Sequence, residues 1–214
     1  MRAAVQGIRD ARVRIEAEAV DARGRTTRSV VTVWILRSPG LVRLEVVEPS
    51  VLADQVYVVD FERLRLLVYL PVTNQVVVQT FDQAFGDSAQ AAQFSPEQLL
   101  AVPAGADKVD LQLAGTEVRG NQLYYVLEGD APAPSAQARQ QAGGRSPLPV
   151  FAPPEASRVR LWVDGSTWLM NRLAFYDASG RNVGSLVLRD LQVNTGLRPA
   201  DLRRLPQGAE IVEG

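Results

Sequence analysis

The sequence contains neither cysteine nor histidine. Without cysteine the chain has no disulfide, no thiolate nucleophile and no site for cysteine-linked lipid. Without histidine it lacks the commonest general base and the commonest metal ligand. These two absences exclude Ser-His-Asp and Cys-His catalytic sites and histidine-based zinc sites. We therefore expect none of these sites. The chain is expected to work without catalysing a reaction, with no catalytic residue, no metal and no cofactor.

Long apolar runs are also missing, since no run approaches the roughly 18 residues that a membrane-spanning helix needs. The first residues, Met1 to Gly7, lack the apolar core of a secretory signal peptide. We expect either a cytosolic chain or a chain whose signal has been removed. The formal net charge is only −1, from 23 basic and 24 acidic residues, so we expect no nucleic-acid partner.

What the sequence does contain is alternation of apolar and polar residues, the period of two that is typical of β-strands. From Arg12 to Ala19 charged residues take one face and apolar residues the other. The stretch from Arg28 to Arg37 is apolar on both faces, so both must be covered or one must line an internal space. The alternating segments are 12–19, 28–37, 41–48, 55–60, 64–70, 75–80, 108–113, 117–119, 122–128, 158–164, 168–176 and 182–191.

These segments predict a mainly β fold of about 10–11 antiparallel strands, in one domain that covers residues 1–214. So many strands form a large curved sheet or an incomplete β-barrel, with space inside. Between residues 81 and 106 the alternation stops, and Ser95 and Pro96 are a good helix start, which predicts a short helical lid. The Pro- and Ala-rich segment 130–157 is expected to be a flexible loop, and the tail from Thr195 shows little periodicity.

Two segments of the chain resemble the LolA-like family of bacterial lipoprotein carriers and lipoprotein-sorting proteins. In residues 28–80 the similar residues, in the order of the family's motifs, are Trp34-Ile35-Leu36-Arg37-Ser38-Pro39-Gly40, Arg43-Leu44-Glu45, Tyr57-Val58-Val59-Asp60, Tyr69-Leu70-Pro71 and Asn74-Gln75-Val76. In residues 158–212 they are Leu161-Trp162-Val163-Asp164, Leu173-Ala174-Phe175-Tyr176-Asp177 and Leu205-Pro206-Gln207-Gly208. The chain departs from the family at Ser38, which separates Arg37 from the proline, and at its short first helical stretch, residues 3–8.

The resemblance implies an incomplete β-barrel around a hydrophobic cavity, closed by a lid of short helices. It implies a periplasmic carrier that takes acyl chains of lipoproteins from an inner-membrane donor and passes them to an outer-membrane acceptor. It also implies that Arg37 is a latch that hydrogen-bonds to the lid. An alternative within the same fold is a sensor or protein-interaction module that does not transport lipid.

The candidate binding residues are apolar side chains of the two-sided strands and of the expected lid. The cavity candidates are Trp34, Leu44, Val46, Val58, Leu66 and Val68. The lid candidates are Phe81, Phe85, Phe94, Leu99 and Leu100. Ordinary core packing explains each of these residues equally well, and Arg37 can equally be a solvated charge at a strand end.

Two other groups of residues have alternative chemical interpretations. Asp54, Asp60 and Glu62 could form an acid pair of the glycosidase type or a calcium site, although turn aspartates usually bond the local backbone. Three aromatic side chains, Trp162, Trp168 and Tyr176, could form a platform for a sugar, although packing within the sheet is more common.

Overall fold

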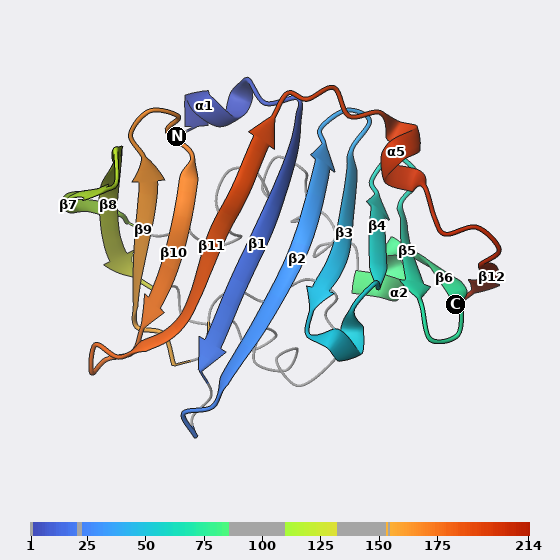
Figure 1. The fold of residues 1–214 in the computed structure, drawn as a ribbon, viewed down its shortest axis with the longest axis horizontal. Helices are drawn as coiled ribbons and strands as arrows, with labels where there is room; N and C mark the ends of the chain where they lie inside the picture. The colour runs from blue at the N-terminus through green and yellow to red at the C-terminus, as the bar shows by residue number, and fades with distance from the viewer. Residues whose placement is uncertain (1, 21–22, 86–109, 132–152, 154) are drawn as a thin grey trace. The chain divides into compact units, whose positions relative to one another are not determined.

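The computed structural model describes residues 2–20, 23–85, 110–131, 153 and 155–214 (Figure 1). Most of the expected lid and of the expected loop at 130–157 lies outside these residues. Among the residues that the structure describes, no helix is long and apolar enough to cross a membrane.

The described residues form twelve β-strands and a few short helices. In chain order they are α1 (Arg2–Gln6), β1 (Asp10–Val20), β2 (Thr26–Leu36), β3 (Leu41–Glu48), η1 (Ser50–Leu52), β4 (Val56–Asp60), β5 (Arg65–Leu70), β6 (Gln75–Thr80), α2 (Phe81–Phe85), β7 (Gln112–Arg119), β8 (Gln122–Asp130), β9 (Arg158–Asp164), β10 (Met170–Tyr176), β11 (Asn182–Val193), α5 (Pro199–Arg203) and β12 (Glu210–Glu213).

The strands follow one another in the order β12-β6-β5-β4-β3-β2-β1-β11-β10-β9-β8-β7. The two end strands, β12 and β7, are not paired with each other, so the sheet that the described residues form is not closed. The expected mainly β fold of the incomplete-barrel type is confirmed. Most neighbours in this order are also neighbours in sequence, because short turns join them as hairpins.

Three features differ from the expectation. The C-terminal tail is not irregular: it contains α5, and it contains β12, which pairs in parallel with β6 through Ile211 and Val76. A strand of four residues is too short for its periodicity to be recognised in sequence. Residues 112–119 form one strand with a register shift, where two separate segments were expected.

Within the chain, two compact units are distinguished, and β1, β2 and β11 each contribute residues to both. Unit 1 comprises Met1–Val5, Glu16–Arg28 and Ala101–Arg189, and unit 2 comprises Gln6–Ile15, Ser29–Leu100 and Asp190–Gly214. In unit 2, Leu36 and Leu41 pack against Leu202 of α5. In unit 1, Trp162 packs with Val126 and Ala174. That the chain is one functional domain remains a prediction.

The β10–β11 hairpin shows how a turn motif fixes the register of two strands. The Asp177 carboxylate accepts hydrogen bonds from the Ser179 hydroxyl at 2.6 Å and from the backbone N–H groups of Ser179 and Arg181. Gly180 completes the turn at φ +84°, a conformation that costs glycine little. The Ser179 hydroxyl is the largest influence that lowers the pKa of Asp177, to about 2. The hairpin expected at residues 177–180 is therefore present.

Candidate functional site

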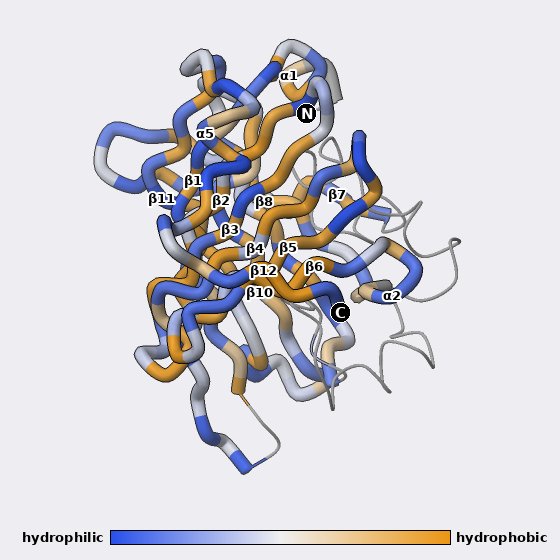
Figure 2. The backbone as a smooth tube through the Cα atoms, turned by 90° about the vertical axis from the view of Figure 1, so that its right-hand side faces the viewer, coloured by the Kyte–Doolittle hydropathy of each residue, from blue (hydrophilic) through white to orange (hydrophobic). Residues whose placement is uncertain are grey.

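Strand register in unit 2 separates an apolar face from a charged one. Residues directly opposite each other in antiparallel strands point to the same side. Val33 of β2 lies opposite Leu44 of β3, which lies opposite Tyr57 of β4 and, beyond it, Val68 of β5. The side chains that share this face are Val31, Val33, Ile35, Val42, Leu44, Val46, Tyr57, Val59, Leu66, Val68 and Leu70. We call them the apolar face. It contains no charged residue across four strands, and Figure 2 shows the hydrophobic colouring of β4 and β5.

Burial of the apolar face changes along the strands. Near the start of β3 its side chains are buried, with Val42 at 0% and Leu66 at 2% exposure. Near the end of β3 they are partly exposed, at Val31, Val46 and Val68. Tyr57 lies between, and its hydroxyl hydrogen-bonds to Gln55 Oε1 at 2.7 Å. Burial raises the pKa of Tyr57, which indicates a poorly solvated surrounding. The side chains of the apolar face are thus more exposed at the end marked by Val46 than at the other end.

The opposite face of the same strands carries charge and is joined to the C-terminal segment. The Arg43 guanidinium donates from Nε to Glu45 Oε1 at 2.9 Å and from Nη1 to the Leu202 carbonyl at 3.3 Å. The Arg203 guanidinium, from α5, donates to Asp60 at 2.8 Å. These bonds explain why α5 lies against β3 at this face (Figure 1).

The six cavity candidates do not share one face. Leu44, Val46, Leu66 and Val68 belong to the apolar face. Trp34 and Val58 lie opposite Arg43, on the charged face. Trp34 packs beside the cluster of Leu36, Leu41 and Leu202, with the Arg12 guanidinium 5.5 Å from its ring centre. Residues 28–37 are therefore apolar on both sides for two different reasons. One side belongs to the apolar face, and the other side packs against Leu202 of the C-terminal helix α5.

Only part of the expected lid falls on described residues. Phe81 begins α2, is buried, and meets Phe61 edge to face with ring centres 5.5 Å apart. Phe85 closes the same helix, and Phe94, Leu99 and Leu100 lie outside the described residues. The lid role of all five remains a prediction.

Arg37, the expected latch, contacts the N-terminal segment. Its Nη1 donates to the carbonyl of Gln6 at 2.8 Å, and its backbone N–H donates to the carbonyl of Arg9 at 2.9 Å. Gln6 is the last residue of α1, so the guanidinium satisfies a carbonyl that the helix leaves without an internal partner. A positive charge is also favourable at a helix C-terminus. Whether Arg37 also holds a lid remains a prediction.

Unit 1 contains an arginine–aromatic ladder that the sequence pattern does not predict, formed by Arg119, Arg160 and Arg172 with Trp162 and Tyr176. The Trp162 ring, only 4% exposed, has the guanidinium carbons of Arg172, Arg119 and Arg160 at 4.8, 5.7 and 5.8 Å from its centre. Its indole N–H donates to Glu117 at 2.6 Å. Hydrogen bonds from Arg119 and then from Trp162 lower the pKa of Glu117. The alternation of arginines at 158, 160 and 172 with aromatics across β9 and β10 was the available signal in the sequence.

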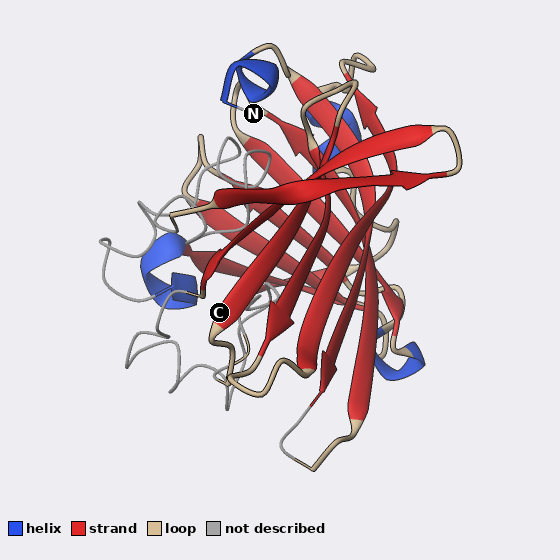
Figure 3. Cartoon of the chain, turned by 90° about the vertical axis from the view of Figure 1, so that its left-hand side faces the viewer, coloured by secondary structure: helices blue, strands red, loops and turns tan. Residues whose placement is uncertain are grey.

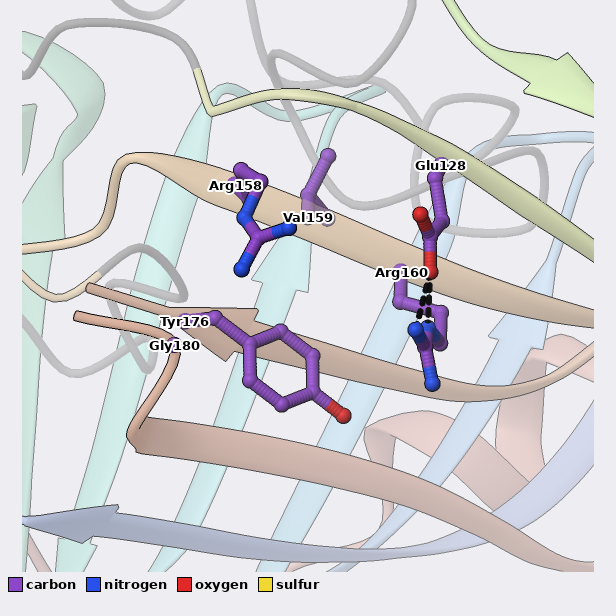
Figure 4. A pocket seen from close by; sticks show the side chains of 6 residues that line it. All are labelled: Glu128, Arg158, Val159, Arg160, Tyr176 and Gly180. Carbon is purple, nitrogen blue, oxygen red and sulfur yellow. Dashed lines mark hydrogen bonds and ion pairs between the residues drawn. The ribbon is translucent and has the colours of Figure 1, made fainter. Parts of the chain in front are cut away.

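A small pocket lies at one end of this ladder (Figure 4). Its volume is about 110 Å³, and it is lined by Glu128, Arg158, Val159, Arg160, Tyr176 and Gly180. Arg160 stacks on the Tyr176 ring at 5.5 Å and forms an ion pair with Glu128. A pocket of this size and charge suits a small polar group, not an acyl chain.

The carboxylates and aromatic side chains that could form an acid pair, a calcium site or a sugar platform make structural contacts instead. Asp60 and Glu62 both bind the Arg203 guanidinium, and Asp60 also accepts the backbone N–H of Arg63 at 3.0 Å. Asp60 thus bonds the local backbone as turn aspartates usually do. Trp168 stacks on Tyr125 at 5.0 Å, apart from the ladder of Trp162 and Tyr176. Within the described residues, no cluster of acidic side chains has the arrangement of a metal site.

Comparison with known proteins identifies the fold. No family model matches the sequence, and no curated protein matches it. Among solved structures, an uncharacterized conserved protein from Thermus thermophilus is 18% identical with a TM-score of 0.59, covering 100% of this chain and 95% of that one. A chain of the MucA/MucB complex of Pseudomonas aeruginosa is 16% identical with a TM-score of 0.51, covering 95% of this chain and 58% of that one. The lipoprotein LppX of Mycobacterium tuberculosis is 15% identical with a TM-score of 0.50, covering 92% of both chains.

The chain shares the fold of these three proteins, which agrees with the LolA-like resemblance of its sequence. The resemblance seen in residues 28–80 and 158–212 is therefore confirmed as far as the fold is concerned. At such low identity the LolA-like fold by itself assigns no cargo and no partner.

Proposed function

We propose that this LolA-like chain is a non-enzymatic carrier that binds acyl chains of lipoproteins or other lipids in the bacterial cell envelope. The observation that supports this proposal is the apolar face of β2–β5, which carries no charge and is partly exposed at the end of β3.

Such a carrier must offset a large free energy, because acyl chains are costly to expose to water. Three acyl chains contain on the order of 45 methylene groups, and exposing each to water costs about 0.8 kcal/mol. The gross cost on the order of 35 kcal/mol means that an enclosed apolar surface is needed for transfer through water. The surface must also release its cargo, which favours contacts by many small apolar side chains over a few polar anchors of high affinity.

The side chains at the accessible end meet this requirement. Val31, Val46 and Val68 are small and partly exposed, and they come from β2, β3 and β5. Leu44 and Leu66 lie deeper and are 4% and 2% exposed. We propose that acyl chains reach the apolar face past the valines and extend toward the leucines.

The location and the partners follow from the same proposal. A carrier of this kind works in the periplasm between an inner-membrane donor and an outer-membrane acceptor. The similar fold of the lipoprotein LppX supports a location in the cell envelope.

Adjacent residues of β5 provide a matched test. Val68 points to the apolar face and Leu67 to the charged face, and both are partly buried. We expect Val68→Asp to weaken binding of a fluorescent fatty acid at least about tenfold, because desolvating a carboxylate costs several kcal/mol. Leu67→Asp should leave the affinity within about twofold, since its carboxylate lies on the other side of the sheet. Equal loss in both variants, or no binding by the unmodified chain, would rule out this face as the lipid site.

A second candidate function is a protein-interaction module. The MucB structure solved in complex with the periplasmic part of MucA supports it, since that chain has a similar fold and holds a protein partner. Native mass spectrometry after purification without detergent separates the two functions. A carrier retains lipid mass, whereas an interaction module retains a protein and no lipid.

A further inference from the structure

Strand β7 ends the strand order of unit 1, and most of its residues are exposed. Within the described residues, β8 pairs with one side of β7 and no strand pairs with the other. Two large apolar side chains on β7 are strongly exposed, Leu113 at 64% and Val118 at 67%. Figure 1 shows the β7–β8 hairpin at its left edge, and Figure 3, which is viewed from that side, shows it in front of the other strands. An open strand edge with exposed apolar side chains is a template for pairing with another strand.

A β-bulge places the two apolar side chains on one face. The register shift between Leu113 and Gly115 makes Leu113 lie opposite Leu127, while Val118 lies opposite Leu123. Leu123 and Leu127 share one side of β8, because they are four residues apart. Thr116, opposite Tyr125, shares that side as well. Without the bulge, Leu113 and Val118 would point to opposite sides.

This arrangement is self-complementary, and we propose that β7 pairs in antiparallel fashion with β7 of a second copy of this chain, with Thr116 on the two-fold axis. Leu113 then lies opposite Val118 of the second copy, and Val118 opposite its Leu113. Glu117 lies opposite Gly115, and Arg119 opposite Gln112. Every residue of the strand except the bulged Ala114 has a partner, and no like charges face each other.

Other two-fold registers are less favourable. Centring the pair on Glu117 would place two carboxylates directly opposite each other, which is destabilising. Centring it on Gly115 or Val118 would pair only part of the strand. The Thr116 register aligns the whole strand, gives a favourable Thr–Thr pair and covers two Leu–Val pairs. The symmetry is the isologous two-fold type that most homodimers use.

Sedimentation velocity tests the pairing directly. Because one strand pair is a small interface, we expect the average sedimentation coefficient to rise between about 10 µM and about 1 mM. Val118→Lys should abolish this rise, since an edge lysine blocks strand addition. Val72→Lys is the control, because Val72 is 92% exposed in the β5–β6 turn. A chain that stays monomeric at about 1 mM, or a dimer that Val118→Lys leaves intact, overturns the proposal and leaves the edge to a strand of another protein.

Cysteine cross-linking tests the register, since the chain has no cysteine of its own. Thr116→Cys should form an intermolecular disulfide on mild oxidation, because the two sulfurs meet near the axis. Val118→Cys should not cross-link to itself, since the two positions are about 13 Å apart along the strands. Mixed with Leu113→Cys, however, it should form the heterologous disulfide. Equal cross-linking of Val118→Cys alone and Thr116→Cys alone would overturn the proposed register.

Discussion

Arg203 donates from Nε to Oδ2 of Asp60 at 2.8 Å, and the Asp60 side chain is only 2% exposed. The same guanidinium reaches Glu62 with Nη2 at 2.8 Å. Asp60 ends β4 and Arg203 ends α5, so this pair joins segments 143 residues apart in sequence. The pair fixes the C-terminal helix beside the charged face of unit 2.

Removing Arg203 is therefore expected to destabilise the chain strongly. Arg203→Leu leaves a buried carboxylate without its principal cation, which costs about 3 kcal/mol. Urea unfolding followed by circular dichroism measures the change. Arg198→Leu is a matched control, because the Arg198–Asp201 pair at the start of the same helix is exposed to solvent and contributes little to stability. Similar losses in the two variants would contradict the role assigned to Asp60.

Acid should weaken the anchoring of the segment after β11. Burial acts to raise the pKa of Asp10, but hydrogen bonds from the Thr195 hydroxyl and from the backbone N–H groups of Thr195 and Gly196 outweigh it, so the pKa lies below the ordinary 3.8. The unfolded chain therefore takes up the proton first as the pH falls. The stabilisation is complete above about pH 5 and is lost as the pH falls through the lowered pKa.

The matched variant for this effect is Asp10→Asn, measured by urea unfolding between about pH 7 and about pH 3. We expect it to be less stable than the unmodified chain at neutral pH, with a difference that narrows toward the acid end. Asp110→Asn changes an exposed carboxyl and should follow the unmodified chain across the range. A difference for Asp10→Asn that stays constant with pH would refute the linkage.

Replacing Arg172 in the arginine–aromatic ladder, in contrast to replacing Arg203, is not expected to lower the stability of the chain. Its Nε is buried and has no hydrogen-bond partner among the described residues. Arg172→Met keeps apolar packing on Trp162 and removes the unsatisfied donor, which offsets the lost cation–π contact, so stability should stay within about 1 kcal/mol of the unmodified chain. Arg160→Met removes the ion pair with Glu128 and two aromatic contacts, so it should be destabilising. Thermal unfolding compares the two, and a marked loss for Arg172→Met would show that its charge is needed.

Substitutions of Arg37 can distinguish its role as a cap of helix α1 from the expected role as a latch of the lid. Arg37→Leu should cost about 1 kcal/mol through the lost bond to the Gln6 carbonyl. If Arg37 is also a latch, the variant should release a bound fluorescent fatty acid at a different rate. Arg37→Lys, which keeps the charge but not the planar fork, is the comparison. Unchanged binding and release in both variants would leave Arg37 as a helix cap only.

Strand register decided which sequence-derived site residues can act together. Alternation correctly located β3, β6 and β9 to the residue, because turns with proline, glycine and asparagine limit them sharply. It could not divide the cavity candidates between two faces, because a strand with apolar residues on both sides has no polar face to orient it. The sequence pattern therefore places Trp34 and Val58 with Leu44 and Val68, although the register puts them on opposite faces.

The sequence by itself determined the class of the fold, since a period of two, frequent turns and the order of short motifs act locally along the chain. It also determined what chemistry is absent, because no cysteine and no histidine are available. Only the tertiary structure decided which apolar side chains share a face, that Arg203 covers Asp60, and that three arginines surround Trp162. These relationships join residues distant in sequence, and their free energy comes from contacts that exist only after the strands have paired.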